Sequence, residues 1–107
     1  MLLLNKDELF TDVYDHLRHV NLSSRLFQLQ EFIRRPENTV VVNIDSQYVY
    51  RPELVSLNYY GIEELYPFIL IVNNLKTLME FDPKLFNNQM LMVKSDVVKK
   101  ILEDIGD

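Results

Sequence analysis

The chain contains no cysteine, which excludes a disulfide framework, thiolate catalysis and a zinc ribbon. Only two of its 107 residues are glycine, so it has no glycine-rich loop of the kind that cradles phosphate groups. Its longest central apolar run covers residues 67–72, far short of the roughly 20 residues that span a bilayer. We therefore expect a protein without a cofactor and without a membrane span.

Charge is weighted towards acid, with 16 Asp and Glu against 11 Lys and Arg and a formal net charge of −5. The basic residues form no stripe, so binding to nucleic-acid phosphates is not expected. Hydrophobic residues make up 48% of the chain and charged residues 25%, which is typical of one globular domain. The N-terminus lacks the basic start and apolar run of roughly 7–15 residues that define a signal peptide. These features predict a soluble protein made in the cytoplasm.

Two amphipathic helical patterns occupy residues 1–36, which we expect to form an N-terminal helical hairpin. Asn5 is expected to cap the first helix. Ser23-Ser24 are expected to cap the second, and Arg34-Arg35 lie in its last turn, where positive charge suits the helix dipole. Pro36 ends it, and we expect packing across this boundary. The apolar stripes consist of Leu9, Phe10, Val13, Tyr14, Leu17 and Val20 in the first helix and Leu26, Leu29, Phe32 and Ile33 in the second.

Two β-branched or apolar segments predict strands over residues 39–44 and 89–93. In the first, Val40, Val42 and Ile44 share one face. Residues 45–47 are expected to turn the chain and residues 48–50 to be extended. Residues 75–85 are expected to be loop-like, with Phe81-Asp82-Pro83 as a turn, and Asn87-Asn88 form a second turn before the second strand.

Between the strands, the sequence predicts two helices that pivot on Gly61. The first begins at Pro52, because proline suits the first helical position, and Gly61 supplies the left-handed conformation that closes it. Pro67 restricts the second helix, which we place from about Glu64 to Asn73. A last helix, capped by Ser95, carries a stripe of Val97, Val98, Ile101, Leu102 and Ile105.

Short motifs in the central region follow one another in a distinctive order: Arg51-Pro52-Glu53-Leu54-Val55, Tyr60-Gly61, Glu64-Leu65-Tyr66, Asn73-Asn74 and Phe81-Asp82-Pro83. This order resembles the LysM-like baseplate wedge proteins of contractile-tailed bacteriophages, over about residues 39–95. The resemblance implies an α+β fold in which a LysM-like strand-helix-helix-strand unit, residues 37–95, follows the N-terminal helical extension, residues 1–36, and precedes a C-terminal helix, residues 96–107.

The resemblance also implies a non-enzymatic structural subunit of a phage tail baseplate or tail-terminal assembly, located in the virion and made in the host cytoplasm. Its partners would be other tail proteins, with multiple copies in a symmetric assembly. The surface that we expect to contact them comprises Tyr50, Arg51, Pro52, Glu53, Leu54 and Asp82, together with Leu2 and Leu4.

Differences from the family pattern bear on glycan binding. The Gly-Asp-Thr that opens the first helix of glycan-binding LysM modules is replaced by Arg51-Pro52-Glu53, Pro67 stands where the family has Trp, and Asn88 replaces the Gly before the last strand. These replacements favour a structural module. A carbohydrate-binding module that recognises peptidoglycan or another N-acetylglucosamine polymer is the first alternative. A small cytosolic adaptor or inhibitor is the second.

Other polar groups have simpler interpretations than chemistry. His16 and His19, with Asp12 and Asp15, have the spacing of ligands on one helix, but a solvated polar face has the same spacing, and we expect no metal. Glu63-Glu64 suit a helix N-terminus, and adjacent residues on a helix do not face each other, so neither they nor Glu80 and Asp82 predict acid–base catalysis.

Tyrosines cluster at positions 48, 50, 59, 60 and 66. Two interpretations stay open for them, a protein- or sugar-binding surface and the completion of a core that lacks tryptophan. Of the five, Tyr60 and Tyr66 are the ones expected in the core.

Overall fold

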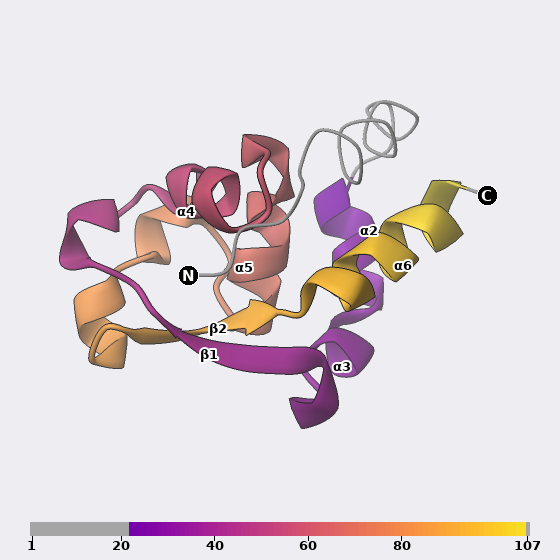
Figure 1. Cartoon of the computed structure of the whole chain (residues 1–107), viewed down its shortest axis with the longest axis horizontal. Coiled ribbons are helices and arrows are strands. Elements are labelled where there is room, and N and C mark those ends of the chain that lie inside the picture. Colours follow the sequence, from indigo (N-terminus) through magenta and orange to yellow (C-terminus); the bar gives the residue numbers. More distant parts are fainter. Residues whose placement is uncertain (1–21, 107) are drawn as a thin grey trace.

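The computed structural model describes residues 22–106, which form five α-helices and one two-stranded antiparallel sheet (Figure 1). The expected α+β class is therefore confirmed. The first predicted helix and the predicted contact residues Leu2 and Leu4 lie outside the described residues. In chain order the elements are α2 (Leu22–Gln28), α3 (Gln30–Ile33), β1 (Thr39–Asn43), α4 (Pro52–Tyr59), α5 (Tyr66–Val72), β2 (Gln89–Val93) and α6 (Ser95–Gly106).

Short 3-10 turns connect these elements. They are η2 (Pro36–Asn38), η3 (Ser46–Tyr48), η4 (Glu63–Leu65), η5 (Leu78–Glu80) and η6 (Pro83–Phe86). The last two replace what the sequence predicted as an open loop before the Asn87-Asn88 turn. Both asparagines of that turn have positive φ, 55° and 62°, and this matches the tolerance of asparagine for the left-handed region.

The sheet joins the two predicted strands in the register that pairs Thr39 with Val93 and Asn43 with Gln89. Side chains that alternate along the strands place Val42, Met90 and Met92 on the face covered by helices, where Met90 and Met92 are fully buried. Ile44, expected on this face, is buried just beyond the end of β1. A two-stranded sheet is marginal on its own, so these buried contacts hold it in place.

The pivot between α4 and α5 is built as the sequence predicts. Pro52 occupies the start of α4, and Gly61 follows its end with φ 97°. The N–H groups of Tyr60 and Gly61 both donate to the carbonyl of Ser56, at 2.8 and 3.1 Å, which closes the helix. Positive φ costs glycine little because it has no Cβ.

The second central helix is shorter than predicted, since α5 covers Tyr66–Val72 and the residues before it form the 3-10 turn η4. Pro67 explains the late start. It sits in the first turn of α5, where its missing N–H leaves no helical hydrogen bond unmade. Asn73 and Asn74 follow the helix, and Asn74 has φ 59°.

The helices α2 and α3 pack against α5, so the expected packing across Pro36 is present. Leu26 and Ile33 are buried in the core. Arg34 links the segment after α3 to the end of α5. Its Nε donates to the carbonyl of Ile71 at 2.8 Å, and a terminal nitrogen donates to Oδ1 of Asn74 at 2.9 Å. Arg34 lies just past the end of α3 and not in its last turn.

Two capping predictions were wrong. Ser23 and Ser24 lie inside α2, which already includes Leu22. Ser95 is itself the first residue of α6, and the N–H of Val98 donates to the carbonyl of Lys94 at 3.0 Å, so Lys94 takes the capping position. The predicted stripe of α6 is confirmed, because Val98, Ile101 and Leu102 are buried in the same core as Leu26.

The prediction of an extended segment over residues 48–50 was also wrong. Tyr48 closes η3, which Asp45 caps by accepting from the N–H of Gln47 at 3.0 Å, and Tyr50 has φ 59°. The chain must reverse here to bring α4 back over the sheet. The need to turn outweighs the strand propensity of two tyrosines and a valine.

Candidate protein-binding surface

One end of the molecule carries a cluster of exposed apolar side chains. It is built from the segment around η3, from η5 and from η6, which lie together at the left of Figure 1. A hydrogen bond of 2.7 Å from the N–H of Tyr50 to the carbonyl of Phe81 joins these segments. We call this cluster the apolar end, and its members are Tyr50, Leu78, Met79 and Leu85.

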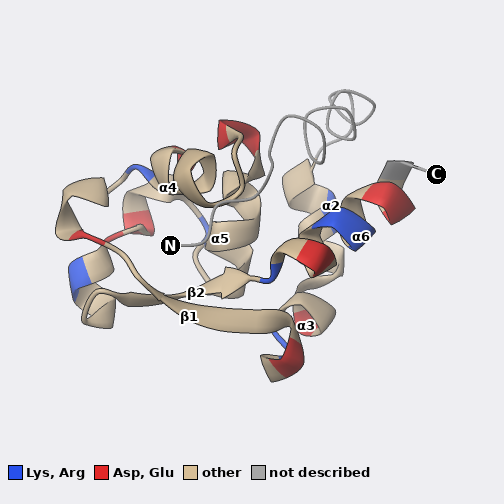
Figure 2. Cartoon of the chain, in the orientation of Figure 1, with Lys and Arg blue, Asp and Glu red and all other residues tan. Residues whose placement is uncertain are grey.

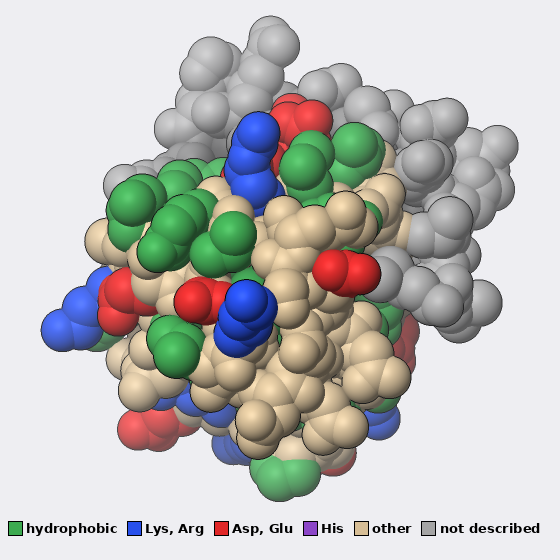
Figure 3. Space-filling model, turned by 90° about the vertical axis from the view of Figure 1, so that its left-hand side faces the viewer, with side chains coloured by type: hydrophobic (Ala, Val, Ile, Leu, Met, Phe, Trp, Pro, Cys, Tyr) green, Lys and Arg blue, Asp and Glu red, His purple; other side chains and the backbone are tan. Residues whose placement is uncertain are grey.

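The side chains of the apolar end are largely exposed to solvent and are not part of the core. Leu85 is 76% exposed, and Met79 is 64% exposed. Figure 3 views the molecule from this side and shows several groups of hydrophobic side chains, mostly in the upper half of the face, with basic and acidic groups between them. Contiguous apolar groups rimmed by polar ones are typical of protein-binding sites.

Tyr50 combines exposure with an unfavourable backbone. Its side chain is 46% exposed, and its φ of 59° lies in the left-handed region, which costs a non-glycine residue roughly 1–2 kcal/mol. Arg51, which precedes Pro52, has φ −130°. The bend is therefore made at Tyr50, two residues before Pro52, which fixes the start of α4.

The remaining predicted contact residues around the start of α4 differ in accessibility. Pro52 is buried, and Glu53 and Leu54 are half-buried, whereas Arg51 is exposed. A terminal nitrogen of Arg51 lies 3.7 Å from a carboxylate oxygen of Glu53, so the two side chains form an ion pair. The accessible part of the predicted surface thus consists of Tyr50 and Arg51, with the edges of Glu53 and Leu54.

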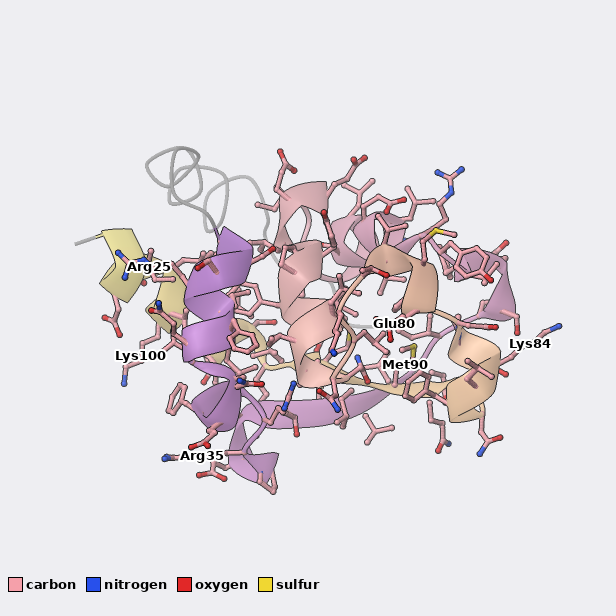
Figure 4. The ribbon with its side chains drawn as sticks, turned by 180° about the vertical axis from the view of Figure 1, so that it is seen from behind. Arg25, Arg35, Glu80, Lys84, Met90 and Lys100 are labelled. Carbon is pink, nitrogen blue, oxygen red and sulfur yellow. The ribbon has the colours of Figure 1, made fainter. Side chains whose placement is uncertain are left out.

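Asp82 lies beside Tyr50 through the bond to Phe81, but its carboxylate serves the backbone. Oδ1 accepts from the N–H of Lys84 at 3.1 Å and caps η6. Oε1 of Glu80 likewise accepts from the N–H groups of Lys76 and Thr77, at 2.8 and 3.1 Å, as part of a capping box. These hydrogen bonds give both carboxylates structural roles. Lys84 points away from the body of the molecule (Figure 4).

The tyrosines divide between the two interpretations. Tyr60 is fully buried, its hydroxyl donates to the carbonyl of Val93 at 2.7 Å, and its ring meets that of Tyr59 edge-on with centroids 4.9 Å apart. Burial raises the pKa of Tyr60 well above its ordinary value of 10 and also raises the pKa of Tyr59. Tyr66, which the sequence placed in the core, is half-buried. Among the five clustered tyrosines, Tyr50 is the one that presents a large exposed surface.

Three residues of the apolar end were missed by sequence reasoning. Leu78, Met79 and Leu85 lie in a region predicted as loop, where no periodic pattern assigns an apolar side chain to one face. The sequence could have indicated them only by exclusion, since none of the three belongs to a helical stripe or a strand face. Apolar residues without such a place are candidates for a surface contact.

A separate groove of about 500 Å³ lies between α2 and α5. Phe27, Arg34 and Ile71 are among its lining residues. Arg34 is already engaged with Ile71 and Asn74.

The predicted His and Asp group at positions 12–19 lies outside the described residues. Within residues 22–106, no cluster of three or more His, Cys, Asp or Glu is arranged to hold a metal ion. No helix in this part of the chain has the length and apolar character needed to cross a membrane. Comparisons of the chain with protein-family models, with curated proteins and with solved structures found no match.

Proposed function

We propose that this chain is a structural, non-enzymatic subunit of a bacteriophage tail baseplate or tail-terminal assembly, and that it binds other tail proteins through the apolar end and Arg51. The ordered motifs from Arg51-Pro52 to Phe81-Asp82-Pro83 support this proposal through their resemblance to LysM-like wedge proteins. The chain order β1, α4, α5, β2, with two helices between paired strands, is the order expected of a LysM-like unit. We therefore propose this unit as the architectural class.

Tyr50 is the observation that carries the proposal. The backbone strain at this position would be relieved by glycine or asparagine, yet the chain has a large aromatic side chain there and leaves 46% of it exposed. A tyrosine offers a wide contact area at low conformational cost, so it is suited to anchor a partner. Leu78, Met79 and Leu85 widen the same surface.

The chemistry of the surroundings favours contact over reaction. The carboxylates of Glu80 and Asp82 accept backbone hydrogen bonds, and Arg51 is paired with Glu53. Affinity would come from shared apolar area with a polar rim. In this proposal the chain is made in the host cytoplasm and ends in the virion tail.

Co-expression with the tail proteins encoded beside its gene tests this function. We expect the wild-type chain to co-purify as a complex, and we expect Met79→Lys and Leu85→Lys to abolish that complex while leaving the denaturant midpoint unchanged. Phe27→Lys is the matched control, because Phe27 is 61% exposed on α2, outside the apolar end. Equal complex formation by wild type, Met79→Lys and Leu85→Lys would remove the apolar end from the proposal, and a wild-type chain that binds none of the tail proteins would overturn it.

Peptidoglycan binding distinguishes the glycan-binding alternative. In a pull-down on insoluble peptidoglycan, we expect the chain to stay in the supernatant. Clear retention that is lost when Tyr50 or Asp82 is replaced would mean that the surface binds sugar and would contradict the structural role.

A further inference from the structure

The outer edge of β2 is closed by side chains from the helices. Nδ2 of Asn73 donates to the carbonyl of Leu91 at 2.9 Å, and Oδ1 of Asn73 accepts from the N–H of Leu91 at 3.0 Å. The hydroxyl of Tyr60 donates to the carbonyl of Val93 at 2.7 Å. An added strand would have to displace these bonds, so β2 cannot extend the sheet.

The outer edge of β1 has the opposite character. In an antiparallel pair, residues alternate between those bonded to the neighbouring strand and those whose N–H and C=O point away from it. The N–H of Ile44 donates to the carbonyl of Asn88, and the N–H of Lys94 donates to the carbonyl of Asn38. The backbone N–H and C=O groups of the even-numbered residues from 38 to 44 therefore point towards β2. The backbone groups of Thr39, Val41 and Asn43 therefore point outward.

Few of these outward N–H and C=O groups have a hydrogen-bond partner within residues 22–106. The N–H of Thr39 donates to the carbonyl of Pro36 and marks the start of the free edge. Within residues 22–106, the N–H and C=O of Val41 and of Asn43 have no hydrogen-bond partner. In Figure 1, β1 runs along the lower margin of the described part of the chain, and none of the described elements lies below its central part.

The edge also lacks the features that usually prevent strand addition. Natural edge strands are protected by lysine, proline, a bulge or a covering element. The sequence of β1 is Thr-Val-Val-Val-Asn, which has no charge and no proline, and Figure 2 shows both strands free of charged residues. Val41, at the centre of β1, is 58% exposed.

We propose that β1 pairs in an antiparallel manner with β1 of a second copy of this chain, around a two-fold axis at Val41. The N–H of Val41 donates to the carbonyl of Val41 in the other copy, and the N–H of Asn43 donates to the carbonyl of Thr39, in both directions. Thr39 then faces Asn43, and Val40 faces Val42, so every side-chain pair is uncharged and mostly β-branched. The result is a continuous four-stranded sheet.

The strand is complementary to itself, and this favours a second copy as the occupant. Centring the axis on Val41 uses every outward N–H of β1 except that of Thr39, which Pro36 already binds. The strand ends at Asn43, because Asp45 begins the turn η3. Both ends of the pairing are thus fixed by the fold, and the register follows from them.

Electrostatics makes this pairing dependent on salt. Glu37 and Asp45 flank β1 and are exposed, and the two-fold axis brings Glu37 of one copy towards Asp45 of the other. With a net charge of −5 on each chain, the copies also repel each other. Screening by salt weakens this repulsion, so the dimer should strengthen as ionic strength rises. A single strand pair is a small interface, so pairing should require high protein concentration.

Amide exchange and sedimentation of the full chain test the proposal. On raising concentration and salt, we expect the sedimentation mass to move from one chain towards two. In the same samples, hydrogen exchange at the amides of Val41 and Asn43 should slow at least about tenfold, while the exposed loop amides do not change. The exchange measurement uses the wild-type protein, so it does not depend on any variant folding.

Val41→Lys should abolish the dimer, because like charges would face each other across the axis. Val41→Thr retains a β-branched uncharged side chain and should keep it, and Phe27→Lys controls for the added charge. A chain that stays monomeric at all concentrations, or a dimer that survives Val41→Lys, would overturn the proposal. Protection of Val41 that appears only with added tail proteins would also overturn it and would assign the edge to a foreign strand. The proposed role in a tail does not enter this test, so either result leaves that role standing.

Discussion

The carboxamide of Asn73 binds both backbone groups of Leu91, and so takes the place of a neighbouring strand on β2. Its Nδ2 donates to the carbonyl of Leu91 at 2.9 Å, and its Oδ1 accepts from the amide at 3.0 Å. The same Nδ2 donates to the carbonyl of Ile69 at 2.9 Å. One side chain therefore ends α5 and fastens the sheet to it.

Asn73→Ala should lower the free energy of unfolding by about 2–3 kcal/mol, because it removes these bonds and leaves part-buried backbone groups unpaired. Denaturant unfolding measures this loss of free energy, and the dependence of that free energy on denaturant concentration should stay unchanged. Gln89→Ala, an exposed change on the same strand, should alter stability by less than about 0.5 kcal/mol. Equal stability of the two variants would show that the Asn73 bonds contribute nothing.

Stability should fall at alkaline pH, and Tyr60 should account for part of the loss. Burial raises the pKa of Tyr60 in the folded chain above its ordinary value of 10, so the unfolded chain loses this proton first. The contribution is fully present below pH 10 and is lost as pH rises above it. Urea unfolding across this range should give a shallower pH dependence for Tyr60→Phe than for wild type.

At neutral pH, Tyr60→Phe should cost about 1–2 kcal/mol, because the carbonyl of Val93 loses the hydroxyl donor. If Tyr60→Phe loses stability with rising alkaline pH as steeply as the wild type does, the group responsible for the loss is not Tyr60. Tyr59→Phe is the matched comparison.

At position 50, backbone conformation should outweigh hydrophobicity. With φ at 59°, Tyr50→Asn should be more stable than Tyr50→Val by about 1 kcal/mol, since asparagine tolerates the left-handed region and a β-branched residue does not. Thermal unfolding of the pair measures the difference. A more stable valine variant would mean that the turn relaxes to another conformation.

Gly61→Val should destabilise the chain by roughly 1–3 kcal/mol, because Gly61 has φ 97° and valine resists it. The melting temperature reports the loss. An unchanged melting temperature would mean that the turn between α4 and α5 can form without positive φ.

Sequence reasoning succeeded where local stereochemistry decides the structure. Pro52 and Gly61 set the ends of α4, and β-branched or apolar runs placed both strands. It failed where tertiary context decides. Tyr48 and Tyr50 have strand propensity but form a turn, because α4 must return over the sheet. Propensity is overridden when a connection has only a few residues in which to reverse.

The candidate site was predicted in part for a similar reason. Arg51 from the motif and its neighbour Tyr50 were predicted as contact residues and are exposed, while Pro52 from the same motif is buried. Met79 and Leu85 were missed because 3-10 turns have no long apolar period. Which side chains of such turns face solvent depends on packing between segments, and this is not a property of the local sequence.

The pairing of Thr39 with Val93 has a kinetic consequence. Along the chain, β1 precedes α4 and α5 and β2 follows them. The two strands therefore cannot pair until the long segment between them has become compact. Helices with local contacts form quickly, whereas distant pairings are slow because the entropy of a large loop is lost first. We therefore expect β1 to be the last element to gain protection during refolding. Until then, its Thr-Val-Val-Val-Asn segment is available to neighbouring chains, so aggregation should compete most strongly at this step.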